Sequence, residues 1–377
     1  MDFTFTEEQQ AAVEAAKAVF SGVAPDAVPS PALTPGAVSE DLDRPLWARL
    51  ATADLLGMTV SPQHGGAGLD PVALCLVLRE SARVLARVPL LETSAVATTV
   101  ERYAPGTTAD ELLPRVCRGE LVLTAASQGR TGHDPAERAV TARRDGTTWI
   151  LDGLQTAVPW AHGADLIAVP AHTADGHTVL ALLPRTHAGL DLGAQYSTHG
   201  ELLAELRLDS VRLDDTEVIT AEGAWEQLRA TLTTGTCALA LGLGEAVLTM
   251  TSQYTGKREQ FGHPVATFQA VAVQAADRYI DLRAMEATLW QAAWRLSSTS
   301  PGALPADGDI AVAKIWASEG VRRVVQTAQH LHGGFGADTD YPLHRYHAWA
   351  KHLELSLGPA AAHEEALGDL LAAHPLG

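Results

Sequence analysis

Residues 254–269 read Tyr-Thr-Gly-Lys-Arg-Glu-Gln-Phe-Gly-His-Pro-Val-Ala-Thr-Phe-Gln, a basic and aromatic stretch that decides how the second half of the chain is interpreted. It joins the first two of four long segments with the 3.6-residue hydrophobic period of a helix. These segments span about 224–256, 265–297, 308–332 and 341–373, and a loop at 297–305 separates the second from the third. Long helices joined by short connections predict an antiparallel four-helix bundle.

The first 222 residues divide into a helical part and a part with short strands. Thr6 is suited to cap a helix that begins at Glu7, and further helices are predicted at 46–56 and from Asp70 to about Arg87. After residue 119, short β-branched runs recur about every ten residues with turn signals between them. The sequence therefore predicts an α+β protein with an all-α domain at 1–120, a β-barrel or sandwich domain at 121–222 and the helical bundle at 223–377.

The composition excludes several classes of protein. Of the 377 residues, 46% are hydrophobic and 19% are charged, which excludes an intrinsically disordered chain. A net charge of −18 argues against nucleic acid or an anionic membrane as a partner. Cys75, Cys117 and Cys237 are few and far apart, as is typical of reduced core cysteines rather than a disulfide framework. The first ten residues lack the basic head and apolar core of a targeting signal, so we expect a cytoplasmic protein.

Two further stretches accompany residues 254–269. Residues 329–342 read Gln-His-Leu-His-Gly-Gly-Phe-Gly-Ala-Asp-Thr-Asp-Tyr-Pro, and residues 62–68 read Pro-Gln-His-Gly-Gly-Ala-Gly, with Glu80 on the next predicted helix. With the order of helical domain, β domain and bundle, these stretches resemble the acyl-CoA dehydrogenase family over essentially the whole chain. The resemblance implies an FAD-dependent enzyme that introduces an α,β double bond into an acyl-CoA thioester and passes the electrons to an electron-transfer flavoprotein.

The resemblance also implies which residues hold the ADP half of FAD, which in the family is bound mainly by a neighbouring subunit. Arg258 offers a planar set of donors to a pyrophosphate, and Gly333-Gly334 lets backbone approach closely because two Cβ atoms are missing. Glutamines can hydrogen-bond adenine, ribose or phosphate, and phenylalanines can pack on flat rings. The implied cofactor-binding residues are Arg258, Gln260, Phe261, Val265, Phe268, Gln269, His330, Gly333 and Gly334.

The sequence departs from the family where members hold the flavin ring. A strand that usually reads Thr-Glu-x-x-x-Gly-Ser-Asp is replaced around Ala125-Ala126, with Gly132-His-Asp at its end. A second strand, usually Trp-Ile-Thr or Trp-Ile-Ser, corresponds to Ala157-Val158-Pro159. Pro159 has no N–H to donate to a flavin oxygen, although Trp160 can pack on a ring out of register. We therefore expect the chain's own flavin-ring pocket to be degraded.

The catalytic base is also missing from its usual place. Family members remove the α-proton with a Glu whose pKa is raised by burial, and Leu357 occupies that position here. The alternative location of the base in some members corresponds to residues 229–235, which hold no carboxylate. Glu354 is a weak candidate, because an unassigned Glu is more often solvated or ion-paired. The catalytic residue of this chain is therefore left unknown.

Several functions remain open at this point. The chain resembles the subunit without the base in bacterial α2β2 assemblies that act on bulky, sterol side-chain-like acyl-CoA, in which a homologous subunit supplies the Glu. The alternatives are a self-sufficient homo-oligomeric dehydrogenase, a flavin-dependent oxygenase of the same fold, and a non-catalytic acyl-CoA-binding or structural subunit. The histidines at 330, 332, 344, 347 and 352 lack the converging spacing of metal ligands, so no metal site is predicted.

Overall fold

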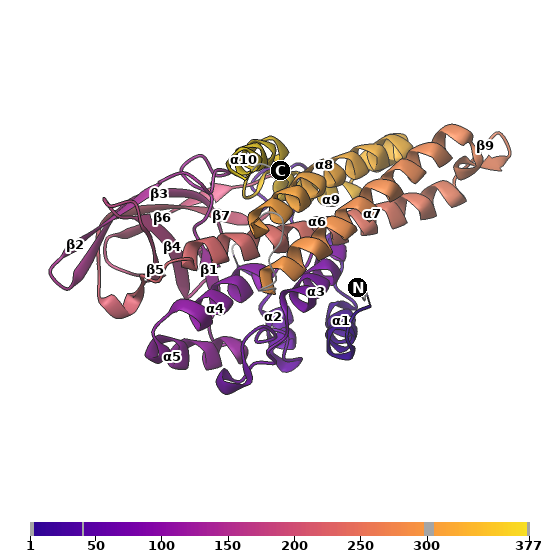
Figure 1. Cartoon of the computed structure of the whole chain (residues 1–377). Coiled ribbons are helices and arrows are strands. Elements are labelled where there is room, and N and C mark those ends of the chain that lie inside the picture. The colour runs from indigo at the N-terminus through magenta and orange to yellow at the C-terminus, as the bar shows by residue number, and fades with distance from the viewer. Residues whose placement is uncertain (1–3, 40, 298–304, 375–377) are drawn as a thin grey trace.

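The computed structural model describes residues 4–39, 41–297 and 305–374. Within these ranges the chain forms a helical N-terminal part, a β-sheet and a helical C-terminal part. The sheet lies at one end of the molecule, and the longest helices extend away from it (Figure 1). This architecture confirms the predicted α+β fold.

The N-terminal part consists of helices α1 to α5. They span Glu7–Phe20, Arg44–Thr52, Pro71–Arg83, Leu90–Tyr103 and Gly106–Cys117. Thr6 caps α1 as predicted, because its hydroxyl accepts from Gln9 N while the Gln9 side chain accepts from Thr6 N. This reciprocal pair satisfies two backbone donors that have no partner inside the helix.

Helices α2 and α3 end earlier than the sequence indicated. The predicted ends were at residue 56 and about residue 87, whereas the helices stop at residues 52 and 83. In each case the chain leaves the helix through a residue with a left-handed backbone, Asp54 at φ +56° and Leu85 at φ +51°. Such a residue cannot continue a right-handed helix.

The strands of the middle part form one mixed sheet within the described residues. Its order is β6-β7-β3-β2-β4-β5-β8, and β1 pairs with β4 in parallel. The strands span Leu123–Ala125, Val140–Asp145, Thr148–Pro159, Leu166–His172, Thr178–Pro184, Leu190–Tyr196, Leu202–Leu213 and Val218–Ile219 for β1 to β8. The sheet has an apolar core of its own, and β1, β4 and β5 also contribute to the core that the helices share.

The C-terminal part consists of α6 Ala224–Lys257, α7 Gln269–Ser297, α8 Ala306–His332, α9 Leu343–Leu355 and α10 Ala360–Ala373. The first three predicted segments are confirmed, and most of the predicted loop at 297–305 lies outside the described residues. The fourth segment is two helices rather than one. It breaks because Leu357 and Gly358 adopt φ +59° and +96°, and Pro359 follows.

Helix α6 is the central element of the molecule. It packs against α3, α4, α7, α8 and α9. It is long and apolar enough to cross a membrane by length and composition, but 78% of its most apolar 18-residue window is buried inside the protein, as in the core helix of a folded domain. At its far end, β9 Glu259–Gln260 and β10 His263–Pro264 form a small hairpin that leads into α7.

Candidate functional site

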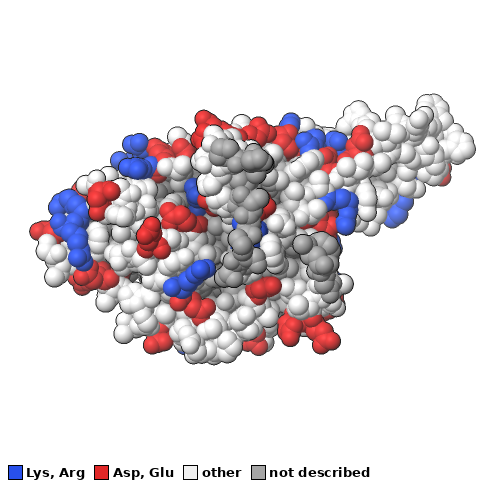
Figure 2. Space-filling view, viewed as in Figure 1, with Lys and Arg blue, Asp and Glu red and all other residues white. Residues whose placement is uncertain are grey.

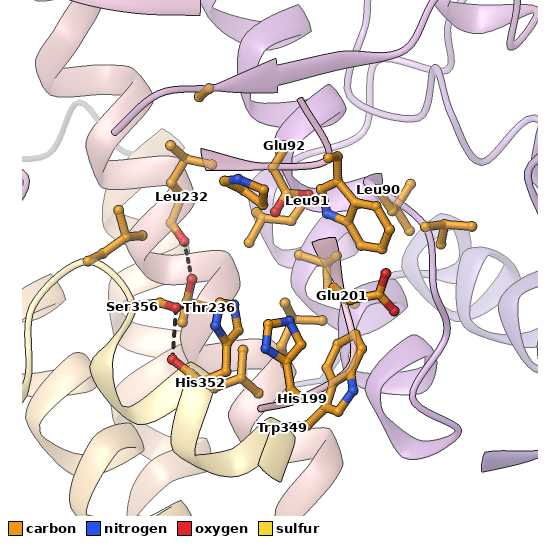
Figure 3. Close-up of a pocket in the computed structure, with 18 of the residues that line it drawn as sticks. Leu90, Leu91, Glu92, His199, Glu201, Leu232, Thr236, Trp349, His352 and Ser356 are labelled. Carbon is orange, nitrogen blue, oxygen red and sulfur yellow. Dashed lines mark hydrogen bonds between the residues drawn. The ribbon is translucent and has the colours of Figure 1, made fainter. Parts of the chain in front are cut away.

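A pocket lies where the three parts of the chain meet. It holds about 830 Å³ of empty space and is lined by residues from α3, α4, α6 and α9 and from the edges of the sheet. Figure 3 shows Leu90, Leu91 and Glu92 of α4 on one side and Trp349 and His352 of α9 on the other. We call this the junction pocket.

Leu357 lies in the wall of the junction pocket, in the backbone segment between α9 and α10. The side chain is 3% exposed. Its N–H donates to Gln128 Oε1 at 2.9 Å, and its carbonyl accepts from His363 Nε2 at 2.8 Å. Two hydrogen bonds and burial therefore hold a leucine in a left-handed conformation that costs about 1 kcal/mol.

Glu354 does not line the junction pocket. Its carboxylate forms an ion pair with Lys351 Nζ at 2.7 Å, one turn earlier on α9. Among the described residues, the carboxylates that line the pocket are Glu92 and Glu201. Neither was singled out from the sequence, because no local motif marks them.

The two pocket carboxylates have different partners. Glu201 is buried and pairs with Arg87 Nε at 2.6 Å. Glu92, at the start of α4, accepts a hydrogen bond from the Trp160 side chain, and burial raises its pKa to about 7. Burial disfavours the charged form of a carboxyl group, so Glu92 carries its proton over much of the range below neutral pH.

A stack of rings lines the α9 side of the junction pocket. The imidazoles of His199 and His352 have their centroids 3.9 Å apart at an interplanar angle of 27°, and Trp349 meets His199 edge-on at 5.1 Å. Burial lowers the pKa of His352 to about 4 and that of His199 well below its usual value. Both imidazoles are therefore neutral at physiological pH.

A buried lysine of α8 holds the end of α9. Lys314 Nζ donates to Ser318 Oγ at 2.8 Å, to Leu353 O at 3.0 Å and to Glu354 O at 3.1 Å. Burial lowers its pKa to about 8. The ammonium group thus satisfies carbonyls that have no partner inside the helix, three residues before Leu357. A charged residue within the apolar run 310–317 was the signal that could have identified it.

The predicted flavin-ring strands carry no free backbone donor at two of the positions expected to face the ring. Ala157 adopts φ +53°, and its N–H already donates to Gln195 Oε1 at 2.7 Å. Pro159 has no N–H, and its carbonyl accepts from Thr124 Oγ1 at 2.7 Å. Ala125 lines the pocket with a methyl group only.

The groove beside the junction pocket is acidic. It runs between the 131–136 loop, the starts of α6 and α8, and α10. Its charged residues are Asp134, Asp307, Glu365 and Asp369, against the single Arg229, which lies 3.9 Å from Asp307. This excess of carboxylates repels a pyrophosphate.

The nine predicted cofactor-binding residues lie away from the junction pocket, on the hairpin and on the neighbouring end of α8. In Figure 1 this hairpin is at the opposite end of the bundle from the sheet. Phe261 is 90% exposed at the hairpin tip, with φ +55°, and Phe268 meets it edge-on at 6.4 Å. Figure 2 shows that the tip of this projection is mostly uncharged on the face in view.

The end of α8 is tied to the end of α6 by stacked rings. Tyr254 stacks on His332 at 4.4 Å and on Phe335 at 5.1 Å. Gly333 has φ +58°, and a Cβ atom added at Gly333 or Gly334 would meet nothing within 4 Å. The structure therefore brings His330, Gly333 and Gly334 to the same end of the bundle as Arg258, and both glycines face open space.

Arg258 is exposed, and its guanidinium makes no ion pair or hydrogen bond within the described part of the chain. A free arginine fork, exposed aromatic rings and unobstructed glycine backbone together form a surface suited to a phosphate and a flat ring. Within the described ranges, no group of three or more His, Cys, Asp or Glu is placed to hold a metal ion.

Family models match most of the chain. Residues 6–120 match the N-terminal domain of acyl-CoA dehydrogenases, and residues 225–371 match their C-terminal domain. The chain belongs to the acyl-CoA dehydrogenase family. It is 34% identical over 343 residues to acyl-CoA dehydrogenase FadE27 of Mycobacterium tuberculosis, covering 90% of this chain and 91% of that one. FadE28 of the same organism is 29% identical, with 98% of each chain covered.

Two solved structures are also similar. One chain of the ChsE4-ChsE5 complex from Mycobacterium tuberculosis superposes with a TM-score of 0.90 at 32% identity, and the match covers 100% of this chain and 100% of that one. A point variant of the Tcur3481-Tcur3483 steroid acyl-CoA dehydrogenase gives a TM-score of 0.88 at 35% identity and covers 97% of this chain and 98% of that one. Each of these two structures is named for a pair of different proteins.

Acyl-CoA dehydrogenases are FAD-dependent oxidoreductases, and the two candidate regions of this chain fit that cofactor unequally. The hairpin end offers Arg258 and open backbone at Gly333, which fit the ADP half. The junction pocket is lined by the ring stack, has no free backbone donor at Pro159 in its wall, and adjoins an acidic groove. It does not fit a flavin ring bound within this chain.

Proposed function

We propose that this chain is the subunit without the catalytic base in a heteromeric, FAD-dependent acyl-CoA dehydrogenase. The observation that carries the proposal is the placement of Leu357. At the position that the resemblance gives to the base, the side chain is buried and apolar, and the nearby carboxylate of Glu354 is paired with Lys351 outside the pocket. A leucine cannot accept the α-proton of a thioester.

The role of this chain is then to complete the flavin site of its partner. Arg258 would pair with the pyrophosphate, and Phe261 and Phe268 would pack against a flat ring of the cofactor. The backbone of Gly333 and Gly334 would approach the phosphate or ribose closely. Gln260, Val265, Gln269 and His330 lie on the same surface and would supply the remaining contacts. When bound, FAD supplies the oxidant for α,β-desaturation.

The partner in this proposal is a homologous subunit that carries the Glu, in an α2β2 arrangement. The paired composition of the ChsE4-ChsE5 and Tcur3481-Tcur3483 structures supports it. The second of these is named as a steroid acyl-CoA dehydrogenase, which supports a bulky, sterol side-chain-like acyl-CoA as substrate, within steroid catabolism. We further propose that an electron-transfer flavoprotein accepts the electrons and that the complex works in the cytoplasm.

One observation favours a second candidate, a self-sufficient dehydrogenase. Glu92 is a carboxyl group in the junction pocket with a pKa of about 7, which is a useful value for a general base. Its hydrogen bond with Trp160 argues against this role, because the carboxyl group is already engaged. The Glu92→Gln variant decides between the two: turnover of the assembled complex is retained if the partner holds the base and is lost if Glu92 is the base.

The decisive experiment is the ratio of FAD to protein in the chain purified alone and in the chain co-expressed with a homologue that carries the Glu. The proposal expects a colourless chain alone and one FAD per pair of chains in the complex. One FAD per chain in the isolated protein would contradict it and support a homo-oligomeric flavoenzyme. Binding of the thioester to the complex without bleaching of the flavin would instead support a non-catalytic subunit.

A further inference from the structure

The junction pocket combines a largely apolar wall with a small group of polar side chains. Much of the apolar wall consists of leucines of α4 and α6, namely Leu90, Leu91, Leu232 and Leu239. Figure 3 shows space between the residues of α4 and the rings of α9. The empty volume of about 830 Å³ lies within the range of about 300–1,000 Å³ that is typical of small-molecule pockets.

The polar side chains of the pocket are connected to one another by short contacts. Gln128 Oε1 accepts from Leu357 N at 2.9 Å, and the preceding Ser356 contacts the imidazole of His352 at 3.3 Å. The ring of His352 stacks on that of His199 at 3.9 Å. These contacts place the amide of Gln128 and both imidazoles in one part of the pocket wall.

Each of the two imidazoles has one unprotonated ring nitrogen. Ser197 Oγ donates its single proton to Glu201 O at 2.9 Å, so the proton in its 2.7 Å contact with His199 Nδ1 comes from the ring. Ser356 Oγ likewise donates to His352 O at 2.8 Å, and His352 Nε2 supplies the proton of their second contact. A neutral imidazole has only one N–H. His199 Nε2 and His352 Nδ1 are therefore acceptors.

These acceptors lie in the same pocket wall as two donors that are also free. No donor bonds to either nitrogen within the described ranges of the chain. Gln128 Nε2 and Ser127 Oγ, which also line the pocket, have no hydrogen-bond partner among the described residues. A ligand hydroxyl group donates one hydrogen bond and accepts up to two, whereas a carbonyl group only accepts. A hydroxyl group therefore matches this combination of acceptors and donors.

The charges around the pocket favour a neutral ligand. Among the described residues that line it, the charged side chains are Glu92 and Glu201, and no lysine or arginine is present. Leu357 lines both this pocket and the acidic groove, whose four carboxylates face a single arginine. A carboxylate or phosphate group in the pocket would lose its hydration without gaining a cation as partner.

We propose that the junction pocket is a binding site for a neutral alcohol with an apolar carbon body. The hydroxyl group donates to an unprotonated nitrogen of the His199–His352 pair and accepts from the donors at Ser127 and Gln128. The carbon body packs against the leucines of α4 and α6. The proposal goes beyond the proposed function, because it requires neither a flavin nor a partner subunit.

The test compares 2-decanol with 2-decanone, which has the same carbon chain but no hydroxyl proton to donate. Isothermal titration calorimetry of the full-length chain measures both affinities, with decanoyl-CoA as an anionic probe. We expect 2-decanol to bind about 10-fold more tightly than 2-decanone, because one hydrogen bond to an otherwise unpaired acceptor has about that effect. Decanoyl-CoA should bind no more tightly than the ketone.

Two variants test the role of the imidazoles. His199→Phe and His352→Phe each keep a flat ring in the stack but remove an acceptor nitrogen. We expect at least one of them to bind the alcohol and the ketone equally, because the hydroxyl proton loses its acceptor. His177→Phe is the matched control, since His177 is exposed on the turn between β4 and β5, and it should keep the preference for the alcohol.

If the phenylalanine variants do not fold, Ser127→Ala removes one donor without changing the stack, and it should weaken binding of 2-decanol several-fold relative to the control. Four results would overturn the proposal: no binding of 2-decanol by the wild type, equal affinity for alcohol and ketone, an unchanged preference in both phenylalanine variants, or tighter binding of decanoyl-CoA. These outcomes are separate from the proposed function, which fails instead on the ratio of FAD to assembled pairs.

Discussion

Glu92 is in an environment unlike that of an ordinary surface carboxylate. Its pKa in the folded protein is about 7, above the usual value of 4.5. The unfolded chain therefore loses this proton at a lower pH than the folded chain does. Its contribution to stability is greatest below about pH 4.5 and is lost as the pH rises toward 7 and above.

We predict that Glu92→Gln makes the free energy of unfolding less dependent on pH. Between pH 5 and pH 8 the wild type should lose about 1–3 kcal/mol from this group, and the variant should not. Urea denaturation at the two pH values measures the difference. Glu111→Gln on the exposed face of α5 is the control and should follow the wild type. Parallel pH profiles for Glu92→Gln and wild type would contradict the assignment.

A second prediction for a single residue tests whether Glu354 or the partner subunit supplies the catalytic base. Since its carboxylate is paired with Lys351, we predict that Glu354→Gln leaves the turnover of the assembled complex within a few-fold of the wild type. Its stability should fall by less than about 1 kcal/mol, as is usual for a partly exposed ion pair. Steady-state turnover with an acyl-CoA substrate measures the effect. A loss of several orders of magnitude would make Glu354 the base.

At the scale of elements, the separation of α9 from α10 depends on Lys314. Two of its three hydrogen bonds cap the end of α9, at Leu353 O and Glu354 O, just before the chain turns at Leu357. We predict that Lys314→Met lowers the free energy of unfolding by about 2 kcal/mol, because buried carbonyls lose a donor. Urea denaturation measures it, with Lys17→Met, an exposed lysine of α1, as the control. A variant as stable as Lys17→Met would show that the break does not require the lysine.

The break between α9 and α10 also shows which parts of the fold could be predicted from the sequence. The periods of α6, α7 and α8 predicted these helices closely, because their apolar positions are set by local spacing. The break at Leu357 was missed, because its backbone N–H is held by Gln128 and the carbonyls just before it by Lys314, and both residues are distant in the chain. A left-handed leucine has no sequence signature, whereas the preference of glycine for this conformation is well known.

The candidate site was predictable to a similar degree. The resemblance placed nine residues in one group, and the structure brings them to one end of the bundle. It also put Leu357 at the usual position of the catalytic Glu and raised the expectation of a degraded ring site, and the structure puts Leu357 in the pocket wall. It did not reveal the stack of His199 on His352 or the contact between Trp160 and Glu92, because each pair joins different domains. Contacts of this kind follow from tertiary packing and not from local pattern.

At the scale of the whole assembly, the prediction concerns Arg258. We expect Arg258→Ala to weaken FAD retention in the complex with the partner by about 2–3 kcal/mol, or about 30- to 100-fold in Kd, because a charge-assisted contact with phosphate is lost. The FAD that remains bound per pair after gel filtration measures it. Arg118→Ala, an exposed arginine that pairs with Glu120, is the control. Equal flavin retention in the two variants would rule out this role of the hairpin.

The exposure of Phe261 has a consequence for the life of the chain before it meets its partner. An aromatic ring that is 90% exposed at the tip of a projecting hairpin promotes non-specific association of a newly made protein. Chaperones and proteases recognise such apolar segments, so an unassembled copy should be cleared faster than one whose tip is covered. The amount of this chain in a cell would then follow the supply of its partner, and unequal synthesis of the two would be corrected by degradation.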